Sequence, residues 1–495
     1  MSRTKILFTD WRDIQCGAVA WTTPAGERYG VGNPPEPQVA MRAERRFIPH
    51  GIRILAQPAR KTEMITGWNG WGRVISDEGR YRSWYIEINR HSKLGSGSAA
   101  HLAPPSSVAI CGVESHDGFH WGEPTRSEIK VPGQRGFDGM TFLIDPHAPA
   151  EQRYKFIYCA QFAEGMFELQ FEAYLQQPSR YRDDRISAQR RFGMFAAVSP
   201  DGVSWTALPK PLMLHPSDTD TTVLWDEGLG KYVMYTRMFR NRRRWIGRAE
   251  ADDFMDWGPV EPIIWPRLDD PPDYDFYLNG YSPYPELPEY QLMLPMLYHR
   301  YTERSEVRLY SSADGVAWNQ IPGGAILTPG EPGAWDCEFI GTGKDLQPFG
   351  KDKIAIPYFG TTYPHKFPRW QAVWDAANMG WAWWPKDRLC ALVADYEGEF
   401  WTTPIIPAGR EIRLNFRTPM AGMIRVGIDG VAERSLEVCD PLIGDWMDKT
   451  VTWRGQSDIG ASEGQPIVLH IQLRAAELFS VTFGDDTKVI KGTRS

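Results

Sequence analysis

The sequence predicts an all-β protein, a five-bladed β-propeller followed by a C-terminal β-sandwich. The first observation is a short turn that recurs four times and ends in tryptophan each time. The four copies lie at residues 115–121, 199–205, 251–257 and 312–318. Three of them contain Asp-Gly, a strong tight-turn signal because Gly accepts a positive φ angle and Asp hydrogen-bonds the nearby backbone. Their irregular spacing is typical of propeller blades that carry insertions.

The second observation is a strand with alternating apolar positions before each turn. Such strands are expected at residues 80–86, 153–158, 230–235 and 290–294, with a fifth at 353–359. A polar turn precedes each strand and joins it to an inner strand, as in a β-hairpin. Five hairpins predict five blades, at residues 60–121, 136–205, 218–257, 273–318 and 335–385.

The chain is expected to divide into four parts. We predict an N-terminal segment packed on the propeller (1–59), the propeller as catalytic domain (60–387), a β-sandwich domain (388–486) and a polar tail (487–495). The sandwich is inferred from short alternating strands separated by Gly, Asp and Pro turns. An insertion in the second blade, residues 164–193, contains an alternating stretch at 167–174 that predicts a strand on the pocket rim.

Composition narrows the class of function. Aromatic residues make up 13% of the 495 residues, with 21 Trp, which suits many short strands. The formal net charge of −7 argues against a nucleic-acid partner. One basic cluster stands at residues 240–244. It is expected at a solvated hairpin tip, or against an anionic group of a partner or substrate.

The sequence gives no sign of a membrane partner or of secretion. No window approaches the roughly 18 consecutive apolar residues of a membrane span. The N-terminal apolar run is broken by Asp10, so it does not form a secretory signal. A cytoplasmic protein is therefore the simplest expectation.

Acidic residues recur at the predicted start of the inner strand in four of the five blades. Inner strands begin beside the propeller axis, so their first side chains converge on one pocket. The acids are Asp138, Asp218, Asp220, Asp275, Asp336 and Glu338. Carboxylates crowded in one pocket repel one another, which raises the pKa of at least one and separates an acid from a base. Glycoside hydrolysis needs such a pair.

We assign Asp138 and Asp220 as the ionised pair, nucleophile or base and stabiliser, and Glu338 as the general acid. The other acids, Asp218, Asp275 and Asp336, are expected to bind substrate hydroxyls or to take over one of these roles. Further substrate-binding candidates are Trp68, Asn69, Tyr277, His299 and Trp335, because flat rings suit sugar faces and polar groups bind hydroxyls. Each candidate has a structural alternative: acids cap blade edges, aromatic rings pack between blades, and a histidine is satisfied at a strand end.

This combination resembles the invertase/inulinase and arabinanase/xylosidase groups of glycoside hydrolases. Residues 139–149, 217–220, 230–233 and 275–277 are more similar still to bacterial proteins that resemble the N-terminal domain of the invertase-like hydrolases. The better-known groups use an Asp of the first blade, an Asp of the second and a Glu of a later blade. This chain departs from them, because its first blade offers Asn69. Another acid, such as Asp10, Glu63 or one from another blade, has to complete the site.

The resemblance implies an exo-acting glycosidase for a small carbohydrate, a glycoside or oligosaccharide, with fructo- or arabinofuranosides favoured. No cofactor is expected, although a ring of acids could hold a structural cation on the propeller axis. Two other functions stay open, a non-catalytic carbohydrate-binding propeller and a lyase for a uronic-acid polymer. The lyase would need Arg, His and Tyr clustered at the pocket. The sequence indicates no oligomeric state.

Overall fold

The structure is a computed structural model of the 495-residue chain. It describes residues 3–17, 19–22, 28–31, 47–65, 73–89, 107–129, 135–162, 165–177, 183–188, 191–219, 221–365 and 378–484. The chain forms two compact units. We call Ala59–Gln320 with Ala325–Trp383 the propeller unit, and Met1–Pro58 with Ile321–Gly324 and Trp384–Ser495 the terminal unit.

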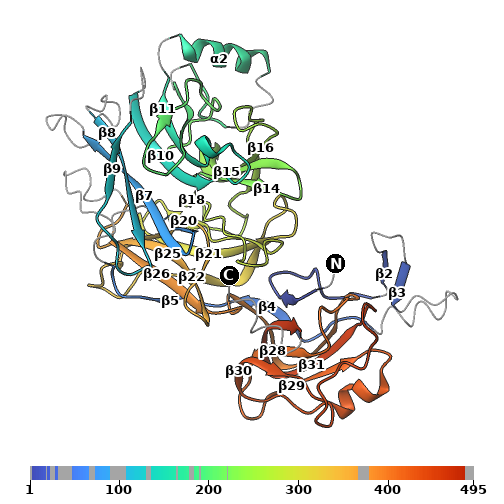
Figure 1. The fold of residues 1–495 in the computed structure, drawn as a ribbon. Coiled ribbons are helices and arrows are strands. Elements are labelled where there is room, and N and C mark those ends of the chain that lie inside the picture. The colour runs from blue at the N-terminus through green and yellow to red at the C-terminus, as the bar shows by residue number, and fades with distance from the viewer. Residues whose placement is uncertain are drawn as a thin grey trace. The chain divides into compact units, whose positions relative to one another are not determined.

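The propeller unit contains five antiparallel sheets, one for each predicted blade (Figure 1). Blade one is β6 (Ile75–Asp77), β7 (Arg80–Asn89), β8 (Ser107–Ser115) and β9 (Thr125–Glu128). Blade two is β10 (Arg135–Ile144), β11 (Tyr154–Gln161), β12 (Phe192–Ser199) and β13 (Thr206–Ala207). Blade three is β14 (Thr222–Asp226), β15 (Lys231–Arg240), β16 (Arg243–Ala251) and β17 (Glu261–Ile264). The described strands thus confirm the all-β, five-bladed prediction.

Blades four and five have interrupted strands. Blade four is β18 (Tyr274–Leu278), β19 (Gln291–Met293), β20 (Met296–His299), β21 (Ser305–Ser312) and β22 (Asn319–Leu327), and both β19 and β20 pair with β21. Blade five is β23 (Phe339–Thr342), β24 (Gln347–Pro348), β25 (Lys353–Thr361) and β26 (Asn378–Pro385), with β5 (Arg60–Lys61) as its outermost strand.

The ring of blades is closed by residues that precede the first blade. In blade five, Lys61 of β5 pairs with Ala382 of β26, and Arg60 pairs with Trp383. The prediction that residue 60 opens blade one is therefore wrong. A short strand from the beginning of the unit completes the last blade, which ties the two ends of the propeller together.

The apolar core lies between neighbouring blades. One cluster combines Trp84 of blade one with Phe142 and Phe156 of blade two, and another combines Val233 of blade three with Phe276 of blade four. Because each blade is twisted, its side chains interdigitate with those of the next blade. Burial of this apolar surface is the main force that holds the ring.

Three of the repeated turns, those of blades one, two and four, also fasten their blade to the one before it. Trp84 Nε1 of blade one donates to the Gly202 carbonyl of blade two at 2.8 Å, and Trp381 Nε1 of blade five donates to the Gly118 carbonyl of blade one at 2.9 Å. Tyr235 Oη of blade three likewise donates to a turn carbonyl of blade four. The tryptophan that ends each turn donates to the carbonyl three residues before it, as Trp205 does to Gly202 at 3.1 Å.

The turn aspartates hydrogen-bond the nearby backbone, as the Asp-Gly signal predicts. Asp201 accepts hydrogen bonds from the backbone N–H groups of Val203 and Ser204 at 2.8 and 2.7 Å. These bonds stabilise the ionised carboxylate, and they lower the pKa of Asp201 to about 2.

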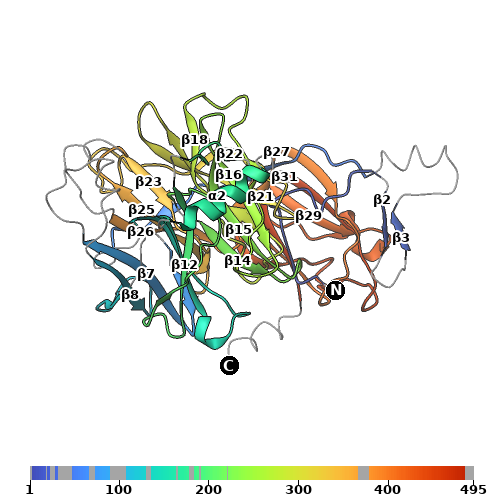
Figure 2. The same ribbon diagram turned by 90° about the horizontal axis from the view of Figure 1, so that it is seen from above.

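The insertion in blade two differs from the prediction. Residues 167–174 were expected as a strand, but Met166–Gln176 form the α-helix α2 (Figure 2). The rings of Phe167, Phe171 and Tyr174 follow one another on one helix face, with centroid distances of 5.1 and 5.3 Å. Leu169, which an alternating strand would bury with Phe167, is 71% exposed. The helical spacing of the aromatic residues therefore outweighs the alternation.

The N-terminal segment contributes two strands to the terminal unit, and its packing on the propeller stays a prediction. Its strands β1 (Lys5–Leu7) and β4 (Arg53–Ala56) pair with β31 (Leu469–Phe483) and β27 (Cys390–Trp401) of the terminal unit. Both short strands bury apolar side chains and complete the hydrogen bonding of a longer strand. A separate hairpin contains β2 (Val19–Thr22) and β3 (Arg28–Val31).

The terminal unit is built around one long strand. β31 pairs with β27, β28 (Ile412–Arg417) and β29 (Met423–Ile428), and β30 (Asp445–Thr450) pairs with β28, which gives a seven-stranded sheet. The sandwich arrangement of residues 388–486 stays a prediction. In the part of the chain that the structure describes, no helix is long and apolar enough to cross a membrane.

Because the repeated turn packs against the neighbouring blade, replacing its glycine by alanine should lower the free energy of unfolding more than the same change at an unpacked glycine with a similar φ angle. Gly202 and Gly79 have φ angles of +77° and +76°, but a Cβ on Gly202 would lie 2.9 Å from Trp84, whereas a Cβ on Gly79 meets nothing within 4 Å. Gly79→Ala should cost about 1 kcal/mol from left-handed backbone strain. Gly202→Ala should cost a further 1–3 kcal/mol, roughly, from overpacking. Urea unfolding of both variants measures the difference, and equal losses would contradict the fastening role.

Candidate active site

The propeller axis is filled by a buried lysine. Lys344 follows β23 in blade five, and its Nζ donates to Thr141 Oγ1 of blade two at 3.0 Å and to the Thr221 carbonyl of blade three. Because blades two and five are not neighbours in the ring, these contacts have to lie at the axis. Arg73 adds a second cation and pairs with Asp345 at 2.8 Å.

The structural cation suggested for the axis stays a prediction. Among the residues that the structure describes, no group of three or more His, Cys, Asp or Glu side chains could hold one. The ammonium group of Lys344 lies where the sequence suggested that acids could hold a structural cation.

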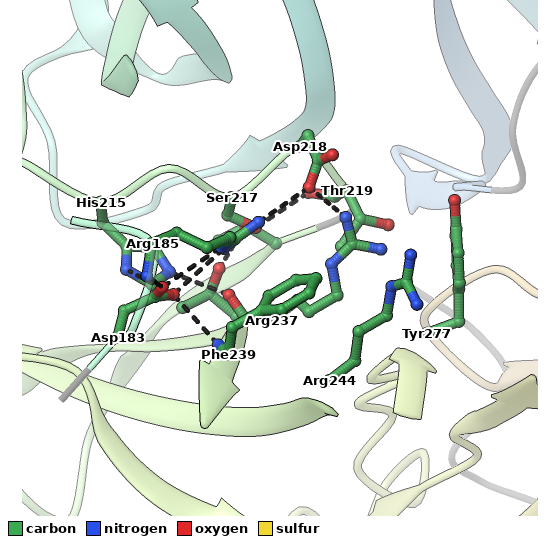
Figure 3. A network of polar contacts seen from close by, with 12 residues as sticks. Asp183, Arg185, His215, Ser217, Asp218, Thr219, Arg237, Phe239, Arg244 and Tyr277 are labelled. Carbon is green, nitrogen blue, oxygen red and sulfur yellow. Dashed lines mark hydrogen bonds and ion pairs between the residues drawn. The ribbon is translucent and has the colours of Figure 1, made fainter. Parts of the chain in front are cut away.

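A dense polar cluster lies where blades three and four meet residues 183–188 (Figure 3). Its cations, which we call the arginine cluster, are Arg185, Arg237, Arg244 and Arg300. They come from the segment after α2, from β15, from β16 and from the β20–β21 hairpin. The starts of the inner strands β14 and β18 supply the carboxylates Asp218 and Asp275 opposite them.

Asp183 and Arg185 form the buried end of this cluster. The Asp183 carboxylate accepts from the Arg185 backbone N–H at 2.8 Å, from the Arg185 guanidinium at 3.1 and 3.2 Å, and from the Phe239 N–H at 3.1 Å. Burial opposes the charge of Asp183, but the charge and hydrogen bonds of Arg185 outweigh it, so the pKa of Asp183 is lowered. These bonds anchor the segment after α2 to blade three.

His215 is buried beside this pair and is neutral at physiological pH. Its Nε2 lies 2.9 Å from the Arg237 carbonyl, which can only accept a hydrogen bond, so Nε2 carries the proton. Burial lowers the pKa of His215 to about 4. His215 therefore adds no charge to the cluster.

Asp218 bridges two arginines. Its Oδ1 accepts from Arg185 Nη1 at 3.0 Å and from Arg237 Nη2, yet 41% of its side chain stays exposed. Burial opposes the charge of Arg237, but Asp218 and Tyr277 outweigh it and raise the pKa of Arg237. The Asp218 carboxylate is accessible from solvent, and its role in substrate binding stays a prediction.

Asp275 is an anchor, and its predicted role as a hydroxyl binder is wrong. Its two oxygens accept from the Arg244 N–H, the Arg244 guanidinium and two nitrogens of Arg300, at 2.6–3.1 Å. The carboxylate has no exposed surface, so no acceptor position is left for a sugar. Asp275 thereby joins the β15–β16 hairpin of blade three to the β20–β21 hairpin of blade four.

Two aromatic rings hold the guanidinium groups. Arg237 lies over the rings of Phe239 and Tyr277, with centroid distances of 5.7 and 4.8 Å, and Arg244 lies over the same rings at 5.3 and 5.2 Å. Tyr277 Oη is 2.7 Å from His365 Nε2. The predicted site residue Tyr277 therefore belongs to a cluster of arginine, histidine and tyrosine.

Blade five contains two candidate acids, the buried anchor Asp336 and the partly exposed Glu338. Asp336 is buried and accepts from Lys61 Nζ at 2.6 Å and Tyr358 Oη at 3.1 Å. It therefore ties down the closing strand β5 and is not placed for the predicted hydroxyl binding. Glu338 keeps 31% of its side chain exposed, and Arg304 Nε lies 3.2 Å from it.

Two further candidates take part in local packing. Trp335 lies against Tyr358, with ring centroids 5.2 Å apart. The His299 ring lies tilted against Tyr274 at a centroid distance of 4.0 Å, and burial lowers the pKa of His299. Both arrangements favour the structural alternatives.

Three predicted residues, Trp68, Asn69 and Asp220, lie outside the described residues. Asp138 lies on β10, where its backbone pairs with Cys159. Its assignment with Asp220 as the ionised pair stays a prediction.

Sequence reasoning missed the arginines of the site. The available signal was the basic cluster at residues 240–244, whose hairpin tip is indeed exposed at Arg242. Arg244, two residues further, points inward to Asp275 instead. Arg185 and His365 stand in loops without a local pattern, so no sequence signal identified them.

Comparison with known proteins gives structural matches alone. No family model and no curated protein matches the chain. A solved structure described as a glycoside hydrolase has 12% identity and a TM-score of 0.45, covering 67% of this chain and 92% of that chain. A thermostable family-43 glycoside hydrolase has 12% identity and a TM-score of 0.42, with coverages of 67% and 96%. The β-1,2-mannobiose phosphorylase of Listeria innocua has 10% identity and a TM-score of 0.43, with coverages of 69% and 92%.

Because the identities are 10–12% and the TM-scores are 0.42–0.45, these matches establish neither an activity nor a substrate for this chain.

The buried neutral His215 predicts a specific loss of stability in mild acid. Its pKa is about 4 in the folded protein and about 6.5 in the unfolded chain, so the unfolded state binds more protons between these values. The free energy of unfolding should therefore fall by about 2 kcal/mol from pH 7 to pH 5 through this residue. In His215→Gln, whose amide can still donate to the Arg237 carbonyl, that part of the loss should disappear. Urea unfolding at both pH values checks this, and an unchanged pH dependence would contradict it.

Removing the charge of Asp275 should destabilise the propeller strongly. Asp275→Asn leaves Arg244 and Arg300 without their buried counter-charge, which should cost about 3–5 kcal/mol. Asp269→Asn is the matched control, because Asp269 pairs with Arg267 at the surface with 68% of its side chain exposed. That change should cost less than about 1 kcal/mol. Thermal unfolding of both variants measures the contrast, and similar losses would refute the anchoring role.

Proposed function

We propose that the propeller unit is a glycoside hydrolase that acts at the end of a glycoside or oligosaccharide, with furanosides as the first candidates. The observation that carries this proposal is the division of the acids at the inner-strand starts. Asp275 and Asp336 are buried anchors, whereas Asp218 and Glu338 keep 41% and 31% of their side chains exposed. Exposed carboxylates at this position are available to a bound sugar.

In this proposal Glu338 is the general acid that protonates the leaving oxygen. Asp138 and Asp220 supply the ionised carboxylates that attack or activate water and stabilise the transition state. Arg304, which also donates to the Cys337 carbonyl at 2.9 Å, positions the Glu338 side chain. A separation of about 5 Å between acid and nucleophile leads to retention, and roughly 6.5–9.5 Å leads to inversion.

A second candidate is a lyase for uronic-acid glycosides. It is favoured by the contact of 2.7 Å between Tyr277 and His365, beside Arg237 and Arg244. In such a reaction the arginines would neutralise the substrate carboxylate, and the tyrosine or histidine would transfer a proton. The product would be an unsaturated sugar that absorbs ultraviolet light.

A screen of aryl furanosides and pyranosides with conservative variants tests the proposal. In Glu338→Gln, Asp138→Asn and Asp220→Asn, turnover should fall at least about 100-fold while sugar binding is kept, because the proton donor or the ionised group is lost. Glu261→Gln, on the exposed start of the outer strand β17, is the control and should keep full turnover.

Three outcomes would count against hydrolysis by these residues. Unchanged turnover in all three variants would remove their assigned roles. An unsaturated product would establish the lyase. Sugar binding without turnover in the unaltered, folded protein would favour the carbohydrate-binding module.

A further inference from the structure

Arg237 is a buried cation with donors that lack partners. Its residue is 3% exposed, and the hydrogen bond that the structure gives its guanidinium runs from Nη2 to Asp218. Nε and Nη1 have no partner of good hydrogen-bond geometry in the described chain, although the Tyr277 hydroxyl lies near enough to help raise the pKa of Arg237. These two nitrogens carry three of the five N–H groups of an arginine. Such groups are costly to bury without an acceptor, so they indicate a place for a ligand.

Arg244 lies beside Arg237 and has the same shortage. Its Nη1 donates to Asp275 at 2.6 Å, but its buried Nε has no partner within the described ranges. Figure 3 shows the two guanidinium groups next to each other between Phe239 and Tyr277. Two cations held this close on shared rings repel each other unless an anion joins them.

The described charges of the cluster are mainly positive, which favours an anionic ligand. Its four guanidinium groups belong to Arg185, Arg237, Arg244 and Arg300, and Arg243, whose Nε lies 4.0 Å from Asp275, adds a fifth positive charge. The described carboxylates that pair with these arginines are Asp183, Asp218 and Asp275, so positive charges exceed negative ones. Asp218 already shows the mode of binding, because its exposed carboxylate bridges two of these arginines.

We propose that Arg237 and Arg244 form a carboxylate-binding subsite, and that the substrate is a glycoside of an acidic sugar, a uronic acid. This inference rests on the proposed function and names the class of sugar for the same site. The planar carboxylate accepts from Arg237 Nε and Nη1 in the two-pronged geometry that guanidinium groups favour. The partly exposed Tyr277 ring lies beside it and contacts the sugar face.

The geometry of the free donors favours a carboxylate as the ligand. Arg237 Nε and Nη1 form one planar fork, which the two oxygens of a planar carboxylate can occupy together. The subsite also differs from a general attraction to the exposed arginines of the 240–244 hairpin. Arg237 lies inside the blade, and screening by salt acts mainly on exposed charges.

Calorimetric titration of the full chain tests the subsite without requiring turnover. The probes are D-glucuronate, D-galacturonate and D-mannuronate, each against its neutral parent sugar, with glucose 6-phosphate as the competing anion. At least one acid should bind tenfold or more tightly than its neutral parent. Arg237→Lys, which keeps the charge but removes the fork, should reduce this ratio at least tenfold, and Arg244→Gln should reduce it as well.

Two control variants separate the subsite from other arginines. Arg248→Lys changes another buried arginine whose Nε has no hydrogen-bond partner in the described chain. The Nη1 of Arg248 pairs with Glu250 on the same strand. Arg242→Gln changes the exposed hairpin tip. Both should keep the preference for the acid, and circular dichroism should confirm that all four variants fold.

The proposal is overturned if acids and neutral sugars bind equally, or if no acid binds. It is also overturned if glucose 6-phosphate binds more tightly than every uronate. The same holds if the Arg242→Gln variant loses the preference for the acid while the folded Arg237→Lys and Arg244→Gln variants keep it. A preference for the acid without any turnover would leave the subsite standing and refute hydrolysis. Turnover of neutral glycosides without a preference for the acid would support hydrolysis and refute the carboxylate-binding subsite.

Discussion

The buried ion cluster around Asp275 is the interaction on which the site depends. One carboxylate with no exposed surface holds Arg244 of blade three and Arg300 of blade four, and it accepts a backbone hydrogen bond from the same hairpin. Without it, two guanidinium groups would face each other across the blade boundary uncompensated. With it, Arg244 stands beside Arg237 and the Tyr277 ring. The blade boundary thereby becomes a place that accepts one further anion.

This cluster can persist because the ring of blades is closed and fastened elsewhere. The closing strand β5 is held by the ion pair of Lys61 with Asp336, and Lys344 fills the axis. On the outer side, Trp84 and its counterparts donate to the turn carbonyls of the next blade. Several acids and cations therefore stabilise the scaffold. The described carboxylates at the inner-strand starts that do not serve as buried anchors stay partly exposed.

More of the fold than of the candidate site could be predicted from the sequence. An Asp-Gly turn is a local signal, since Asp201 caps backbone groups only two and three residues away. The blade count followed from the five strand hairpins, which are also local signals. The fate of each acid depends instead on distant partners. Asp336 is buried because Lys61, 275 positions away, reaches it, and Arg185 meets Asp218 only through the ring topology. The helix α2 was missed because its aromatic residues fit both a strand and a helix period until the exposure of Leu169 is known.

A crystal structure of the full chain with the tightest-binding uronate tests the central claim most directly. The account predicts the sugar carboxylate within hydrogen-bond distance, about 3 Å, of Arg237 Nε or Nη1, with the ring against Tyr277. A uronate whose carboxylate points to solvent, or that binds away from Arg237 and Arg244, would contradict it.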